Sequence, residues 1–259
     1  MILPLLAIGV IGGFFAGLFG VGGGFIMVPL LLLWLRFDQR RASATSLLAI
    51  VPPAALSAVL YGAQGQIDLL AAAIVAAGAL GGAPLGTLLL RRLSLVWLKW
   101  LFIAGLVATA LRLVLTVPER AGTLEYGVAA VVGLVALGLV MGIVAGLLGV
   151  GGGIIAVPVL IAVFGMGDLL AKGTSLLALI PGALLGTAAN LRADLLRVRD
   201  GLLMGLAAAA SSLGGVALAF WLPAQVSAWL FAALLLVVIV QLALRPAGPS
   251  PRRSDTATP

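Results

Sequence analysis

Residues 17–29 read GLFGVGGGFIMVP, and the same glycine-rich stretch returns as GLLGVGGGIIAVP at residues 146–158. Ten of the thirteen positions are identical, at a constant offset of 129 residues. The offset continues without a gap to a Thr-Ser-Leu-Leu-Ala segment that begins at Thr45 and recurs at Thr174. The chain is therefore an internal duplication, and its two glycine clusters occupy equivalent positions in two halves.

The composition is that of an integral membrane protein. Hydrophobic residues make up 63% of the chain, charged residues 9%, and the mean hydropathy is +1.29, whereas a soluble domain carries about 25% charged residues. The apolar runs reach the ~20 residues that a helix needs to cross a bilayer, and they lack the alternation of barrel strands. We expect an all-α, polytopic helical bundle of two inverted repeats, each with a glycine-broken helix.

The apolar runs divide the chain into two transmembrane repeats. We expect the first repeat at residues 1–117, a linker at 118–125, the second repeat at 126–244 and a disordered cytoplasmic tail at 245–259. The arm after the first glycine cluster, residues 25–35, covers only about half the membrane at ~1.5 Å per residue. The remaining expected spans are residues 42–62, 69–90 and a segment ending near 117, and then 173–189, 201–222 and 228–244.

The placement of basic residues predicts opposite orientations for the two halves. If each broken segment turns back at its glycines, twelve basic residues lie on one side, against Arg112, Arg120 and Lys172 on the other. If each broken segment crosses the membrane once, seven basic residues lie on one side and eight on the other. The positive-inside rule favours the first arrangement, with both termini in the cytoplasm. Whether the broken segments are re-entrant or cross twice stays open.

The glycine clusters are candidate substrate-binding sites. Such a run breaks a helix, and within hydrocarbon a break is tolerated only where protein buries it or water lines it. The short helices that follow would present N–H groups and a positive dipole end to an anion. Close helix packing is the alternative role. Pro29 and Pro158 shape the short helices, because proline has no N–H to donate. The candidate glycines are Gly20, Gly22, Gly23, Gly24, Gly149, Gly151, Gly152 and Gly153.

Two hydroxyl pairs, Thr45 with Ser46 and Thr174 with Ser175, form the second group of substrate-binding candidates. Each pair lies near the start of the second apolar segment of its half, where a hydroxyl can donate to a bound oxyanion. Bonding back to the carbonyl one turn earlier is the alternative.

Several chemistries are excluded or left open by the remaining residues. The chain has no histidine and no cysteine, so we expect no metal site, no cofactor and no enzyme of the nucleophile-and-base type. Asp68 and Asp200 begin the third segments and suit helix N-termini, with proton coupling as the alternative. No deep carboxylate is visible, so uniport and proton coupling both stay open. The basic residues lie in short loops, which argues against nucleic acid.

The doubled glycine motif, followed in each half by Thr-Ser-Leu-Leu-Ala, resembles the TauE/SafE family of sulfite exporters, also called the TSUP family. The resemblance covers residues 5–244. It implies a multi-pass permease of the bacterial-type inner membrane that exports small sulfur-containing anions such as sulfite and organosulfonates. The family's motif falls on the two glycine stretches, and its hydroxyl pairs fall on the two Thr-Ser pairs.

The expected function is secondary transport of a small anion across the lipid bilayer, by alternating access about a midplane site at the two glycine breaks. A transporter of another small anion and a structural or accessory membrane protein are the alternatives. The sequence leaves the substrate, the direction, the coupling ion and the oligomeric state open, a homo-oligomer included.

Overall fold

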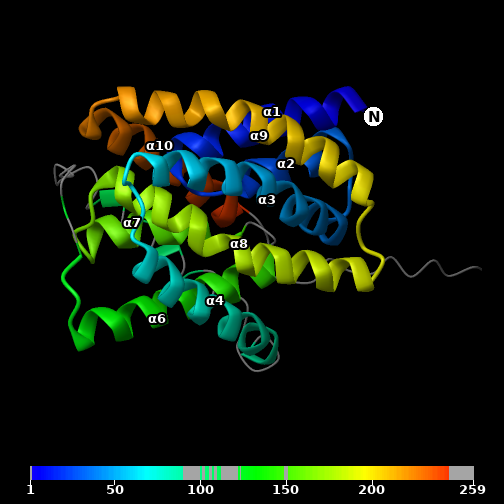
Figure 1. The fold of residues 1–259 in the computed structure, drawn as a ribbon. Helices are drawn as coiled ribbons and strands as arrows, with labels where there is room; N and C mark the ends of the chain where they lie inside the picture. The colour runs from blue at the N-terminus through cyan, green and yellow to red at the C-terminus, as the bar shows by residue number, and fades with distance from the viewer. Residues whose placement is uncertain are drawn as a thin grey trace, which may run out of the picture.

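The computed structural model of the chain describes residues 2–89, 100, 103–104, 107, 110–111, 122, 124–148 and 151–244. Within these residues the chain is helical and has no strand (Figure 1). Six helices are long and apolar enough to cross a membrane, which confirms the predicted all-α polytopic class. The helices are α1 (Ile2–Phe19), α2 (Gly24–Trp34), α3 (Gln39–Ala63), α4 (Leu69–Leu89), α6 (Val128–Leu148), α7 (Gly153–Ala162), α8 (Asp168–Arg192), α9 (Val198–Trp221) and α10 (Ala224–Leu244).

The helix bounds repeat with the same offset as the sequence. Helices α2, α3 and α4 begin at residues 24, 39 and 69, and α7, α8 and α9 begin at residues 153, 168 and 198, each 129 residues further on. The left-handed backbone positions repeat as well. Arg36 has φ 51° and its counterpart Gly165 has φ 67°. Gly65 has φ 69° and its counterpart Asp194 has φ 53°. The two halves therefore share one local structure.

Each half packs its helices against helices of the other half. Helix α1 lies along α9, and α6, the counterpart of α1, lies along α4, the counterpart of α9. Figure 1 shows α1 and α9 on one side, α4 and α6 on the other, and α3 and α8 between them. The close approach of α1 and α9 depends on small residues, since Gly9 packs on the Met204 carbonyl and Gly17 on the Ser212 carbonyl. The contacting residue numbers rise together along the two helices, so α1 and α9 run parallel.

The central helices α3 and α8 run in opposite directions. A Cβ atom on Gly173, near the start of α8, would lie 2.8 Å from Cβ of Tyr61, near the end of α3. A Cβ atom on Gly186, further along α8, would lie 3.1 Å from Leu47, near the start of α3. Because α3 and α8 are repeat counterparts, these two equivalent helices point opposite ways.

Helix α2 folds back along α1 after the glycine break. Gly23, the residue before α2, packs on the carbonyl of Gly12, and Met27, one turn into α2, packs on the same Gly12. A helix that continued away from α1 would not return to residue 12. With 11 residues, α2 is also too short to cross alone. The first broken segment is thus a helical hairpin with a short second arm.

One predicted boundary was wrong in a way that matters for function. The expected span at residues 173–189 left Asp168 and Lys172 in a loop, but α8 begins at Asp168, so both charged residues lie inside the helix and are buried. Helix α3 likewise begins at Gln39 rather than at residue 42. The predicted tail at 245–259 and most of the predicted span ending near residue 117 lie outside the described residues.

Candidate functional site at the meeting of the two glycine breaks

The glycine breaks of the two halves lie against each other. Gly153, the first residue of α7, packs on the backbone of Val21, so that a Cβ atom on residue 153 would lie 2.9 Å from the Val21 carbonyl oxygen. Ile50 of α3 contacts both breaks: a Cβ atom on Gly22 would lie 2.9 Å from its Cγ2, and one on Gly151 would lie 3.2 Å from its Cδ1. Two clusters far apart in sequence thus form one junction.

The apolar side chains at this junction come from equivalent positions. Leu179 of α8 is the repeat counterpart of Ile50, and a Cβ atom on Gly22 would lie 3.2 Å from its Cδ2. Both side chains are buried. The central helices α3 and α8 therefore each place one buried aliphatic side chain against the glycine breaks.

The chain enters α2 and α7 through left-handed glycines. Gly23 has φ 74° and ψ −12°, and Gly152 has φ 72° and ψ −14°, and neither helix has a side-chain cap. A residue with a Cβ atom adopts this conformation only at a cost. The first N–H groups of a helix have no partner within it, and they carry the positive end of the helix dipole. Two such ends meet at this junction.

The other predicted glycines and the two prolines belong to the same breaks. Gly20 has φ 72°, and Gly24 is the first residue of α2. Pro29 and Pro158 lie inside α2 and α7, where each removes one helical hydrogen bond. Gly149 lies outside the described residues.

Three of the four predicted hydroxyls are buried with no hydrogen-bond partner among the described residues: Thr45 Oγ1, Ser46 Oγ and Ser175 Oγ. An unsatisfied buried hydroxyl costs about 1–3 kcal/mol, so these groups are expected to have a partner in the working protein. Thr174 differs, because its Oγ1 accepts a hydrogen bond from the Asp68 N–H at 3.0 Å. Its role in the fold is to join α8 to the start of α4.

Ser46 and Ser175 are the hydroxyls nearest the junction along their helices. Ser46 precedes Ile50 by four residues on α3, and Ser175 precedes Leu179 by four residues on α8. Residues four apart lie on the same face of a helix, one turn from each other. Each unpartnered serine is therefore one turn from the aliphatic side chain that contacts the breaks.

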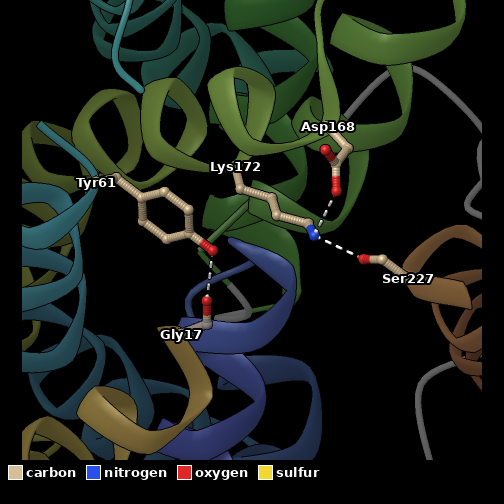
Figure 2. Close-up of polar contacts among 5 residues, drawn as sticks. All are labelled: Gly17, Tyr61, Asp168, Lys172 and Ser227. Carbon is tan, nitrogen blue, oxygen red and sulfur yellow. Dashed lines mark hydrogen bonds and ion pairs between the residues drawn. The ribbon is translucent and has the colours of Figure 1, made fainter. Parts of the chain in front are cut away.

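Close to the first break lies a buried ion pair that sequence reasoning missed. Lys172 Nζ donates to Asp168 Oδ2 at 3.2 Å and to Ser227 Oγ of α10 at 2.7 Å (Figure 2). These three residues are at most 3% exposed. Nearby, the Tyr61 hydroxyl donates to the Gly17 carbonyl at 2.9 Å, which ties the end of α3 to the end of α1.

A signal for this pair was present in the sequence. Asp168 and Lys172 are spaced i, i+4, which places an acid and a base on one helix face, and the offset aligns them with Gln39 and Ser43 at the start of α3. Hydropathy alone assigns two charges to a loop, whereas a paired acid and base can be buried. The expectation that Asp168 and Lys172 lie in a loop was therefore wrong, because both are buried within α8.

Asp68 caps α4 at the end of the bundle where α8 begins. Its carboxylate accepts a hydrogen bond from the Ala71 N–H at 3.0 Å, as a helix N-terminus favours, and another from the Tyr126 hydroxyl. Partial burial, followed by the hydrogen bond to Asp68, raises the pKa of Tyr126 to about 12. This contact joins the segment before α6 to the first half.

An ion pair closes the opposite end of the bundle. Arg41, in the first turn of α3, contacts Asp200, in the first turn of α9, at 3.2 Å, and its guanidinium stacks on the ring of Phe37 at 4.0 Å. Asp38 caps α3 by accepting from the Arg41 N–H. The loops before α3 and before α9 therefore meet at one end.

This fold, with its buried break at the centre, is that of a multi-pass membrane protein. The chain belongs to the sulfite exporter TauE/SafE family, which residues 1–113 and 134–259 match. It is 35% identical over 89 residues to the probable membrane transporter protein YunE of Bacillus subtilis, covering 34% of this chain and 33% of that one. It is 33% identical over 94 residues to a probable membrane transporter protein of Xylella fastidiosa, covering 36% of each. The matches span about a third of these relatives' length. No solved structure matches the chain.

Proposed function

We propose that this membrane transporter moves a small oxyanion, and that the anion binds at the junction of the two glycine breaks. One observation carries the proposal: the two breaks touch through Gly153 and Val21, and two buried serine hydroxyls that lack partners among the described residues lie one helical turn from Ile50 and Leu179, which contact the breaks. Such a site combines two positive helix ends with hydroxyl donors. An oxyanion supplies the acceptor oxygens that both kinds of donor lack.

The substrate class follows from the donor set and from the family. Neutral N–H and O–H donors suit a small, singly charged oxyanion, because a buried multiple charge would need more counter-charge than helix ends supply. The family is described by sulfite export. We therefore infer a singly charged sulfur oxyanion, such as hydrogen sulfite (the protonated form of sulfite) or a small organosulfonate, with export as its direction.

Alternating access would arise from the two halves. The opposite courses of α3 and α8 support an inverted-topology repeat, in which rocking of two repeat-related units against each other opens the site to each side in turn. The interlocked pairs α1 with α9 and α4 with α6 would move as two units.

The protein would lie in a bacterial-type inner membrane with both termini in the cytoplasm. The contact of Arg41 with Asp200 supports this, because it puts two basic loops, residues 36–41 and 192–199, at one end of the bundle. Loops rich in Arg and Lys stay on the cytoplasmic side.

Counterflow in proteoliposomes tests the proposed function. Vesicles with the purified full-length protein are loaded with unlabelled sulfite or methanesulfonate, and entry of the labelled anion is followed. Accumulation above empty vesicles, competed by the same anion, is the expected result. No counterflow of either anion by correctly inserted protein, as judged by protease protection, would overturn the proposed substrate class.

A further inference from the structure

We propose that the buried pair Asp168–Lys172 couples anion binding to the uptake of one proton, so that the anion and a proton cross together. The inference rests on the proposed anion site. In the anion-free protein Lys172 is neutralised by Asp168; when the anion binds, Asp168 takes a proton from water and Lys172 becomes the counter-charge of the anion.

The backbone of Lys172 lies directly beside the first glycine break. A Cβ atom on Gly20 would lie 2.6 Å from Cα of Lys172, so the backbone of Lys172 contacts the break. Asp168 lies one turn earlier on α8, and its Oδ1 is buried without a hydrogen-bond partner among the described residues. The carboxylate therefore has one oxygen engaged with the ammonium and one oxygen at which a proton can bind.

Charge balance favours this coupling. Asp168 and Lys172 together carry no net charge, and a buried anion added to them would be uncompensated, which is costly in a low-dielectric interior. A proton on Asp168 makes the carboxyl neutral and gives the pair one positive charge. One anion and one proton then leave the anion and the pair neutral together.

Among the described residues, the polar and titratable groups around the pair come from α10, α3 and the starts of α4 and α9. Helix α10 contributes Ser227, whose hydroxyl holds Lys172, and α3 contributes Tyr61, which interacts electrostatically with Asp168. The described residues of α4, α6 and α7 have no ionisable side chain. The Asp68 N–H donates a hydrogen bond to Thr174 Oγ1 of α8, and the Asp68 carboxylate accepts one from the Tyr126 hydroxyl. Arg199 and Asp200 begin α9 at the opposite end, where Asp200 meets Arg41.

The other half contains the neutral version of the same pair. Gln39 and Ser43 occupy the equivalent positions on α3, and Gln39 Nε2 contacts Ser43 Oγ at 3.4 Å. If the pair only held the start of the helix together, an uncharged pair such as Gln39 and Ser43 would serve in both halves. The duplicated fold therefore carries a single charged pair at this repeat position, as coupling of one proton requires.

Calorimetric titration of the purified full-length protein with methanesulfonate tests the inference. A sulfonate stays ionised at every working pH, so any proton taken up binds to the protein. Titration in two buffers of different ionisation enthalpy counts these protons. We expect about one proton per bound anion, and a dissociation constant that rises with pH by up to about tenfold per pH unit. Sulfite is titrated in parallel as a second anion.

Variants assign the proton to Asp168. Asp168→Asn mimics the protonated acid, so it should bind the anion within about threefold of the wild-type affinity at low pH, without proton uptake and without pH dependence. The double variant Asp168→Asn with Lys172→Gln removes both charges and leaves no lone buried ion; it should bind the anion at least about tenfold more weakly. Ser43→Ala, at the repeat counterpart of Lys172, is the matched control and should behave as wild type.

The outcomes separate the inference from the proposed function. If the wild-type protein binds neither methanesulfonate nor sulfite, the anion site is overturned and the coupling falls with it. If an anion binds without proton uptake, only the coupling is overturned. Proton uptake that persists in Asp168→Asn would overturn the assignment to this carboxyl, and unchanged affinity in the double variant would overturn the role of Lys172.

Discussion

Gly153 lies on the backbone of Val21, and a Cβ atom at residue 153 would come within 2.9 Å of the Val21 carbonyl oxygen. Gly153→Ala should therefore push the two glycine breaks apart, because backbone atoms cannot rotate out of the way. We expect transport to fall at least about tenfold and the protein to lose about 1–3 kcal/mol of stability. Counterflow and thermal melting in detergent measure the two effects.

The matched control for this substitution is Gly182→Ala on α8. Gly182 is helical and has nothing within 4 Å of where its Cβ atom would lie. Alanine should be neutral or stabilising by up to about 1 kcal/mol there, because it is the better helix former. If Gly153→Ala melts and transports like Gly182→Ala, the two breaks do not depend on close contact.

Ser46→Ala and Ser175→Ala should impair transport while leaving stability unchanged or slightly higher. Each hydroxyl is buried without a partner among the described residues, so removing it relieves an unsatisfied group in the anion-free protein. A hydrogen bond to a charged partner contributes about 1.5–3 kcal/mol, so each variant should bind the anion about tenfold to a hundredfold more weakly. Calorimetry and melting are the measurements.

Ser57→Ala provides the comparison for the two serines. Ser57 is on α3 as well, is fully buried, and its hydroxyl also lacks a partner among the described residues, but it lies eleven residues beyond Ser46. We expect its anion affinity to match wild type. Equal losses in all three variants would mean that the serines act on the fold and not on the anion.

Tyr126 should titrate near pH 12 because burial and the hydrogen bond to Asp68 favour its neutral form. Since this pKa is raised above the unfolded value, the stability that the contact contributes is fully present below about pH 10 and is lost as pH rises from about 10 to 12. Ultraviolet titration can follow the phenolate, because the chain has two tyrosines and Tyr126→Phe identifies the signal.

Asp68→Asn is the partner experiment for this titration. It keeps the size of the side chain but removes the negative charge next to the phenol, so the pKa of Tyr126 should move down towards its ordinary value near 10. A Tyr126 titration that stays near 12 in Asp68→Asn would assign the whole shift to burial.

Single cysteines at Gln64 and Ala193 should be labelled from opposite sides of the membrane. The two residues are repeat counterparts, both are exposed, and they follow the ends of α3 and α8, which run in opposite directions. The chain has no native cysteine, so a membrane-impermeant maleimide reports only the introduced one. We expect Ala193→Cys to react from the cytoplasmic side. Labelling of both from one side would contradict the inverted orientation.

The repeat made most of the fold predictable. An exact offset in the glycine motif and the Thr-Ser pairs predicts two equivalent halves, and the 11-residue length of α2 was anticipated to within one residue at each end. Helix breaks are local, because glycine conformation depends on neighbouring residues. Such features can be predicted from the sequence by spacing alone.

The contacts between halves could not be predicted in the same way. Ile50 contacts both Gly22 and Gly151 because of how α3 packs against the two glycine breaks. No residue spacing within either half predicts that contact. The buried pair Asp168–Lys172 was missed for a different reason. A hydropathy pattern treats each charge separately, whereas burial depends on whether two charges meet.

The anion site itself is tested most directly by comparing Gly151→Ala with Gly65→Ala in counterflow. Both glycines have positive φ, 83° and 69°, so alanine strains the backbone similarly in each. At Gly151 the new methyl group would enter the junction 3.2 Å from Ile50, whereas at Gly65 it would meet nothing within 4 Å. We predict at least about tenfold slower counterflow for Gly151→Ala and near wild-type rates for Gly65→Ala. Equal rates in the two variants would contradict anion binding at the junction of the glycine breaks.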